Sequence, residues 1–201
     1  MKKTILVIDA CVRREESRTK KLLEAALDTV RKEHPDWNLE ILNLMDLDLM
    51  YWKTETLKER DELLAKKEYD APVFKYGNQF READGVIVAA PFWDLSIPAV
   101  LKVYIENISA EGITFGCNEN GLYGLCKAKW LLFLTTRGGI WADSDMEQGS
   151  TYMEALCKFF GIDEYACVYA DGIDVQELDG EEILREAIEE TKGICTRLSC
   201  E

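Results

Sequence analysis

The feature of this sequence that most restricts its fold is the alternation of short, uninterrupted apolar runs with longer amphipathic segments. Four runs stand out: TILVI at 4–8, DGVIVAA at 84–90, WLLFLTT at 130–136 and YACVYA at 165–170. Continuous apolar runs of this length are typical of strands that are buried on both faces, as in parallel sheets. A weaker run, NLEILNL at 38–44, predicts a fifth strand.

The segments between the runs predict helices. Residues 17–34 form one, which Pro35 ends. Its apolar stripe consists of Leu22, Leu23, Ala26, Leu27 and Val30. One or two helices are expected within 54–81, which Pro72 interrupts.

Three more helices follow along the chain. One begins at Ser96-Ile97-Pro98, with Ser96 as N-cap and Pro98 in the first turn. Another covers 149–160 and ends at Gly161, and the last covers 181–198.

Strand–helix alternation of this kind predicts an α/β fold, with a five-stranded parallel sheet between two layers of helices. With 201 residues, a single domain over 1–201 is expected. In such sheets the ligand lies outside the carboxyl ends of the strands, at the topological switch point. A site is therefore expected just after Ile8, Ala90, Thr136 and Ala170.

Charge and hydropathy exclude several classes of partner. The formal net charge of −14 disfavours nucleic acid and anionic membrane surfaces, because both reward clustered lysine and arginine. No apolar run approaches the roughly 18 residues of a membrane span, and no secretory signal is recognisable. We therefore expect a cytoplasmic protein that holds any anionic ligand locally, through backbone N–H groups, hydroxyls or a single arginine.

The side chains used most often for nucleophilic or metal chemistry are poorly represented. The seven cysteines contain no C-x-x-C pair, which disfavours a disulfide framework, a zinc site and an iron–sulfur cluster. The single histidine, His34, is expected at the surface, so no Ser–His or Cys–His pair exists. Asp46 and Asp48 are expected in a solvated loop rather than a cation site. A cofactor that performs the reaction itself would explain this composition.

Ser17, Arg18 and Thr19 stand where the first predicted helix begins, after the connection that follows the first strand. Free N–H groups and the positive end of the helix dipole make such a position a phosphate site, to which two hydroxyls and a guanidinium would add contacts. The alternative is that Ser17 only caps the helix. Neither G-x-G-x-x-G nor G-x-x-x-x-G-K-[ST] is present.

The connection after the third strand contains Pro91, Phe92, Trp93, Asp94 and Leu95. It can form a wall for a flat aromatic ring, with backbone amides turned toward the polar edge of that ring. The alternative is that Phe92 and Trp93 close the core over the end of the sheet.

The connection after the fourth strand contains Thr136, Arg137, Gly138 and Gly139. The glycines allow close approach of the backbone, and Arg137 could neutralise an anion or a reduced ring. The alternative is an ordinary glycine-rich turn. Three unusual connections at one edge of a sheet favour a ligand site over any of the separate alternatives.

Three segments together resemble the FMN-dependent NADH-azoreductase family, which are flavodoxin-like NAD(P)H:quinone and azo reductases. They are APFWDLSIPAVLKVYIENI, EGITFGCNENGLYGL and LLFLTTRGGIW. The similarity runs nearly from end to end and is weakest between Tyr51 and Arg81. The order and spacing of several motifs make the resemblance more specific than any single one.

The resemblance implies a flavodoxin-like three-layer α/β/α fold and a homodimer with one FMN per subunit near the interface. It also implies ping-pong hydride transfer from NADH or NADPH to a quinone, an azo compound or a similar flat acceptor. By position, the family's Ser-x-Ser phosphate loop falls on Ser17–Thr19. Its Met-Tyr-Asn-Phe segment falls on Phe92–Leu95, and its Ser-Arg-Gly-Gly segment on Thr136–Gly139.

Two further regions correspond to the family's substrate pocket. The pocket's Arg and Tyr are replaced by Gly116 and Cys117, which leaves substrate preference open. Phe159 matches an aromatic residue near the pocket, although its helical spacing suits a core role equally well.

The sequence departs from the family at two further places. An early serine gives way to Asp9-Ala10-Cys11, and an asparagine gives way to Asp94. We hypothesise that a carboxylate at Asp94 disfavours an anionic reduced flavin.

Three functions are compatible with this sequence. The first is an FMN-dependent NAD(P)H oxidoreductase, in which the flavin does the chemistry and no residue acts as general acid or base. The second is an FMN electron carrier whose acidic surface docks to a basic redox partner. The third is a flavodoxin-like binding module that has lost its cofactor.

Overall fold

The computed structural model describes residues 2–200 and contains a five-stranded parallel sheet. The strand order is β2-β1-β3-β6-β7, which is the flavodoxin-like order. The strands are β1 (Thr4–Asp9), β2 (Asn38–Asn43), β3 (Gly85–Ala89), β6 (Trp130–Thr136) and β7 (Glu164–Ala170). All five predicted strands are confirmed, within one or two residues at their ends.

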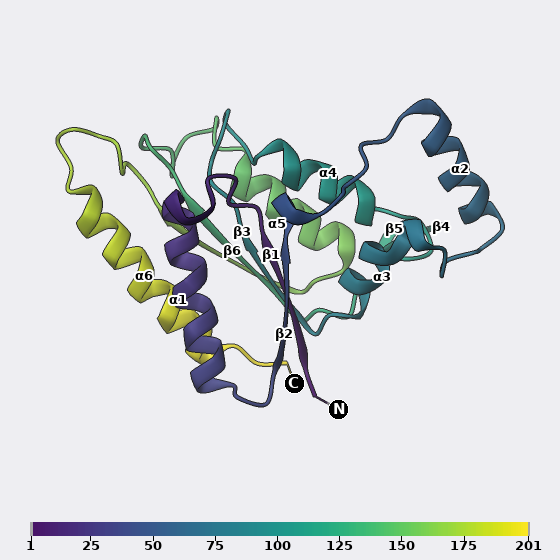
Figure 1. The fold of residues 1–201 in the computed structure, drawn as a ribbon, viewed down its shortest axis with the longest axis horizontal. Helices are drawn as coiled ribbons and strands as arrows, with labels where there is room; N and C mark the ends of the chain where they lie inside the picture. The colour runs from purple at the N-terminus through teal and green to yellow at the C-terminus, as the bar shows by residue number, and fades with distance from the viewer. Residues whose placement is uncertain (1, 201) are drawn as a thin grey trace.

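Helices cover both faces of this sheet (Figure 1). The helix α1 (Arg18–Glu33) lies beside α6 (Gly180–Arg197) on one face. On the other face lie α3 (Lys75–Glu82), α4 (Ala99–Ile108) and α5 (Gly149–Phe160). The predicted three-layer α/β/α architecture is therefore confirmed.

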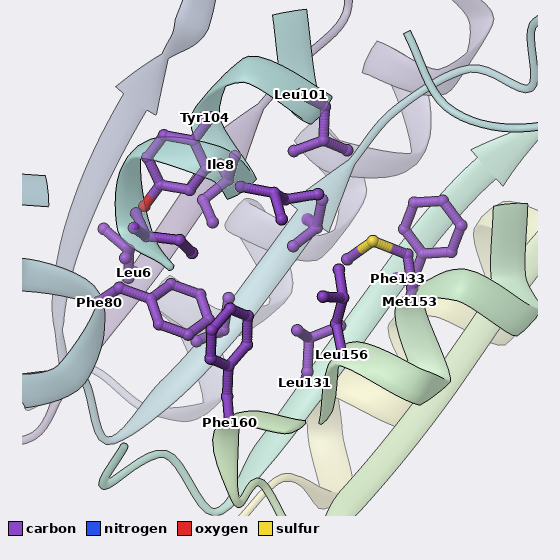
Figure 2. Packing of buried hydrophobic residues seen from close by; sticks show 14 of the residues in the cluster. Leu6, Ile8, Phe80, Leu101, Tyr104, Leu131, Phe133, Met153, Leu156 and Phe160 are labelled. Atoms are coloured by element: carbon purple, nitrogen blue, oxygen red, sulfur yellow. The ribbon is translucent and has the colours of Figure 1, made fainter. Parts of the chain in front are cut away.

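The two helical layers rest on two separate apolar cores. Alternate residues of each strand point to opposite faces, so Ile5 and Val7 face α1 while Leu6 and Ile8 face the α3–α5 layer. The predicted stripe of α1 is buried against the sheet. Figure 2 shows the second core, where Phe80 and Phe160 meet with ring centroids 5.1 Å apart.

The segment 54–81, in which one or two helices were expected, contains most of two helices, α2 (Thr54–Ala65) and α3. The helix α2 buries no residue and projects from the body of the molecule (Figure 1). A short 3-10 turn at Pro72–Phe74 separates it from α3, as the interruption by Pro72 predicted.

The prediction that Ser96 caps α4 is wrong. Ser96 instead pairs with Trp93 in a tight turn, in which each residue donates its N–H to the carbonyl of the other. Pro98 is the N-cap, because its carbonyl oxygen accepts the first α-helical bond, from the Lys102 N–H at 3.3 Å.

Two features were missed or misjudged. A hairpin of β4 (Phe115–Asn118) and β5 (Gly121–Gly124) was not predicted, although Asn-Gly at its turn is a hairpin signal. His34, expected at the surface, is half-buried, stacked on Trp37 and bonded through Nε2 to the Cys195 carbonyl at 3.0 Å.

Metal-ion and membrane binding were also considered from the sequence. The carboxylate of Asp46 forms an ion pair with Arg14 at 2.6 Å. Within residues 2–200, no cluster of three or more His, Cys, Asp or Glu side chains is arranged to hold a metal ion. No helix in the same range is long and apolar enough to cross a membrane.

Candidate flavin site

A cleft of about 300 Å³ lies at the carboxyl ends of the strands, on the edge of the sheet where the site was expected. Connections after β1, β3, β6 and β7 all contribute to its walls. Its lining residues are Arg13, Glu16, Ser17, Arg18, Pro91, Phe92, Trp93, Thr136, Arg137, Gly138, Ile173 and Asp174. The structure thus brings together residues from all three motifs that the sequence singled out.

Ser17 stands at one end of the cleft, at the N-cap position of α1. Its backbone has the extended conformation of an N-cap, yet its side chain makes no capping hydrogen bond. Capping alone therefore does not account for the hydroxyl. The hydroxyl and the N–H groups of Arg18 and Thr19, which have no acceptor among the described residues, together suit an anionic oxygen.

Arg18 and Thr19 differ in what their side chains can reach. Arg18 is exposed, and its Nη2 lies 2.6 Å from Asp174 Oδ1 across the cleft. Thr19 is fully buried, and its hydroxyl lies 2.7 Å from the hydroxyl of Thr136. The Thr19 side chain therefore joins α1 to β6, and only its backbone N–H is left for a phosphate.

Trp93, which lines the cleft, begins a tight turn at 93–96, whose other residues are not among the lining residues. Asp94 and Leu95 both have positive φ, 48° and 67°, which with the reciprocal Trp93–Ser96 bonds defines a type I′ turn. Such angles are strained for leucine and recur at ligand sites. Among residues 2–200, the N–H groups of Asp94 and Leu95 have no acceptor, so both stay available to a ligand.

The two aromatic side chains beside this turn do not close the core. Phe92 is half-buried and contacts Trp141, with ring centroids 5.7 Å apart, while Trp93 is 37% exposed. Both residues line the cleft. The structure therefore favours the ring-wall interpretation over the core-lid alternative.

Arg137 is the largest buried polar side chain in this region, only 1% exposed. Its guanidinium lies between Glu147 at 3.4 Å and Asp171 at 3.6 Å and over the ring of Tyr169. The atoms Nε and Nη1 of Arg137 have no hydrogen-bond partner within residues 2–200. Two carboxylates thus already balance this cation, so its primary contact is with the protein.

Glu147 and Asp171 were missed by the sequence analysis. Glu147 Oε1 accepts the N–H groups of Gly149 and Ser150, each at 2.9 Å, and so caps α5. Asp171 Oδ2 accepts the N–H groups of Trp141 and Ala142, at 2.8 and 3.0 Å. Arg137 therefore connects the carboxylates that hold two neighbouring segments in place.

Gly138 allows two segments of the site to lie side by side. A Cβ atom on Gly138 would lie 2.7 Å from Asp174 Oδ2. The Gly138 carbonyl accepts the Asp174 N–H, and the Gly139 carbonyl accepts the Gly172 N–H, both at 2.9 Å. The sequence analysis expected a site just after Ala170, where this segment lies, but named none of the residues Gly172–Asp174.

Asp9-Ala10-Cys11, which replaces the early serine of the family, is buried next to Ser17. Asp9 pairs with Lys20, and burial, reinforced by the charge of Asp9, raises the pKa of the Cys11 thiol well above its usual value. Cys11 is therefore a neutral thiol at physiological pH, which rules out a thiolate nucleophile at this position.

The two predicted substrate-pocket residues do not line the cleft. Cys117 is exposed on β4, and Phe159 packs on Phe115 with ring centroids 4.5 Å apart. Phe159 lies ten residues beyond the start of α5, about 15 Å along the helix axis. Within one subunit, these residues are thus separate from the cleft.

The donors of the cleft fit FMN part by part. The Ser17 hydroxyl, which makes no capping hydrogen bond, and the N-terminus of α1 suit the phosphate. The partly exposed side chains of Phe92 and Trp93 suit a flat ring. Two backbone N–H groups without acceptors suit the polar edge of that ring. This combination of sheet order and site defines the flavodoxin-like flavin-binding class.

Comparisons with known proteins agree with this class. A family profile described as a flavodoxin-like fold matches residues 3–194. The FMN-dependent NADH:quinone oxidoreductase of Clostridium beijerinckii is 34% identical over 192 residues, covering 94% of this chain and 96% of that protein. The FMN-dependent NADH:quinone oxidoreductase 2 of Clostridium acetobutylicum is 35% identical, covering 88% and 89%.

Solved structures give the same result. The azoreductase from Bacillus anthracis str. Sterne superposes with a TM-score of 0.88 at 28% identity, covering 98% of this chain and all of that one. An FMN-dependent NADH-azoreductase from Bacillus anthracis str. Ames Ancestor, solved in complex with FMN, gives 0.85 at 25% identity and covers 98% and 99%. The chain belongs to the family of FMN-dependent NADH:quinone oxidoreductases and azoreductases, as the sequence resemblance predicted.

Proposed function

We propose that this protein is an FMN-dependent oxidoreductase that transfers hydride from NADH or NADPH to a quinone, an azo compound or a similar flat acceptor. The observation that supports this most is the convergence of four strand-end connections on one cleft whose donors match the parts of FMN. The enzymatic names of its relatives support the same reaction class. Bound FMN supplies the hydride chemistry, and the protein supplies binding and orientation.

Each part of the cleft has a distinct task in this proposal. Ser17, Arg18 and the first turn of α1 bind the phosphate. Phe92 and Trp93 shield one side of the ring from water, and the N–H groups of the 93–96 turn orient its polar edge. Arg137 and its two carboxylates hold the surrounding segments. No side chain at the cleft is assigned as a general acid or base.

We propose a ping-pong order for this reaction. Trp93 lines the cleft and is exposed, and the donor and the acceptor are both flat. We infer that the two bind at the same exposed side in turn, so the nicotinamide leaves before the acceptor enters.

The acceptor pocket is proposed to be completed by a second subunit. Cys117 and Phe159 lie away from the cleft of their own chain. They can contribute to a substrate pocket only if a homodimer brings those of one subunit to the cleft of the other. Sedimentation equilibrium tests this directly, and a monomer at micromolar concentration would contradict it.

The test of the proposed function is an absorbance spectrum taken before and after addition of NADH without oxygen. We expect the bands of oxidised FMN, their bleaching by NADH, and their return on addition of a quinone. Bands that NADH and NADPH leave unchanged would favour the electron-carrier alternative. A protein that binds no flavin, even after FMN is added, would contradict the proposal and leave the binding-module alternative.

A further inference from the structure

Asp9 and Lys20 form an ion pair near Ser17 and Arg18, which we call the phosphate end of the cleft, and neither Asp9 nor Lys20 lines the cleft. Lys20 Nζ lies 2.5 Å from Asp9 Oδ2, and the two side chains are 18% and 3% exposed. Lys20 belongs to the first turn of α1, where its N–H donates to the Ser17 carbonyl at 3.1 Å. The pair therefore lies within one helical turn of the residue expected to contact phosphate.

The carboxylate of Asp9 has a structural reason to be there. Its Oδ1 accepts the Cys11 N–H at 3.0 Å, and the Cys11 carbonyl accepts the Arg14 N–H at 2.8 Å. The connection from β1 to α1 contains no glycine. The hydrogen bond from the Cys11 N–H to the Asp9 carboxylate therefore stabilises the first turn of this connection. The consequence is a buried negative charge close to a site for a phosphate dianion, and like charges repel strongly where water is largely excluded.

We propose that Lys20 is a positioning residue that cancels the charge of Asp9, so that the start of α1 keeps a positive potential toward the phosphate of FMN. This inference rests on the proposed function, because it assumes that FMN binds in the cleft. Burial alone would lower the pKa of Lys20, but the hydrogen bond and charge of Asp9 outweigh burial and raise it. Lys20 is therefore cationic throughout the physiological range.

The test compares FMN with riboflavin, which lacks the phosphate. Protein stripped of flavin is titrated with each ligand, and quenching of flavin fluorescence gives the two dissociation constants. In Lys20→Met, we expect the Kd for FMN to rise about tenfold while that for riboflavin changes less than about twofold. Lys20→Arg should restore FMN binding, because it returns the positive charge.

A double variant supplies the decisive control. In Asp9→Asn/Lys20→Met both charges are absent and the asparagine can still accept the Cys11 N–H, so FMN affinity should return to within about threefold of wild type. Asp9→Asn alone should bind FMN at least as tightly as wild type. This single variant also keeps the test decisive if Lys20→Met fails to fold.

Three results would overturn the inference. The first is an unchanged Kd for FMN in Lys20→Met, and the second is an equal loss of FMN and riboflavin binding, which would indicate a purely structural role. The third is weaker FMN binding in Asp9→Asn. A wild-type protein that binds neither flavin would instead overturn the proposed function, so the two failures are distinguishable.

Discussion

Two arginines line the cleft, and their side chains differ in burial and in their partners. Arg18 lies at the phosphate end, and Arg137 lies over the Phe92 ring, at what we call the ring end. At the phosphate end, Arg18 is 43% exposed and has one exposed partner, Asp174. At the ring end, Arg137 is 1% exposed, lies between two carboxylates and packs against aromatic rings. The same type of side chain is thus exposed with a single ion-pair partner in one place and buried between two carboxylates in the other.

The difference in burial determines what each arginine can do. An exposed ion pair is stabilised little and can exchange its carboxylate for a phosphate at small cost. A buried guanidinium between two carboxylates cannot leave without exposing their charges to a poorly solvated interior. We therefore assign ligand contact to the phosphate end and geometric support to the ring end.

The largest expected effect is on folding stability at the ring end. Arg137→Met should lower the free energy of unfolding by about 3–5 kcal/mol, because Glu147 and Asp171 lose the cation between them. Arg18→Met is the matched control and should cost less than about 1 kcal/mol. Urea unfolding of flavin-free protein measures both, and equal losses would break the contrast between the two ends.

The next effect is on cofactor affinity at the phosphate end. Ser17→Ala should raise the Kd for FMN by roughly ten- to a hundredfold, because a hydroxyl that donates to a charged oxygen contributes about 1.5–3 kcal/mol. Ser109→Ala is a suitable control, since its hydroxyl bonds the Ile105 carbonyl on α4, away from the cleft. Fluorescence titration provides the readout, and similar constants for both variants would remove Ser17 from the site.

A smaller effect is expected on the redox properties of the ring end. Asp94→Asn should raise the two-electron midpoint potential by about 30 mV, because the exposed carboxylate no longer opposes negative charge on the reduced flavin. Spectroscopic titration against a dye of known potential measures the shift. A potential identical to that of wild type would show that the Asp94 side chain points away from the flavin.

The smallest effect concerns the exposed ion pair itself. Asp174→Asn releases Arg18 and should tighten FMN binding by no more than about threefold, with the gain shrinking as salt screens the contact. Titrations at low and high ionic strength reveal it. A loss of affinity would mean that Asp174 orients Arg18 toward the phosphate rather than competing for it.

The sequence predicted the strands and the cleft-lining residues better than the side chains that hold Arg137 in place. Continuous apolar runs identify buried parallel strands, and their order places Ser17, Phe92 and Arg137 at one edge of the sheet. The partners of Arg137 could not be identified in this way. Glu147 lies in an irregular connection without periodicity, and Asp171, although it directly follows the last strand, has no local pattern that pairs it with Arg137. A carboxylate in such a segment looks the same whether it is solvated or buried.

Competition between a helix cap and a tight turn explains the error at Ser96. Ser96 with Pro98 two residues later has the pattern of a helix start. Ser96 instead closes the type I′ turn with Trp93, and the helix begins at Ala99. Asp94 has a φ of 48° in this turn, a conformation that aspartate tolerates as asparagine does.

A crystal structure of the FMN complex tests most directly where FMN lies in the cleft. We predict the phosphate within hydrogen-bond distance of the Ser17 hydroxyl and the first-turn N–H groups of α1. We also predict the ring against Phe92 and Trp93, with an edge oxygen or nitrogen near the N–H groups of Asp94 and Leu95. A phosphate bound at the Arg137 end, or FMN bound outside this cleft, would contradict the division of tasks between its two ends.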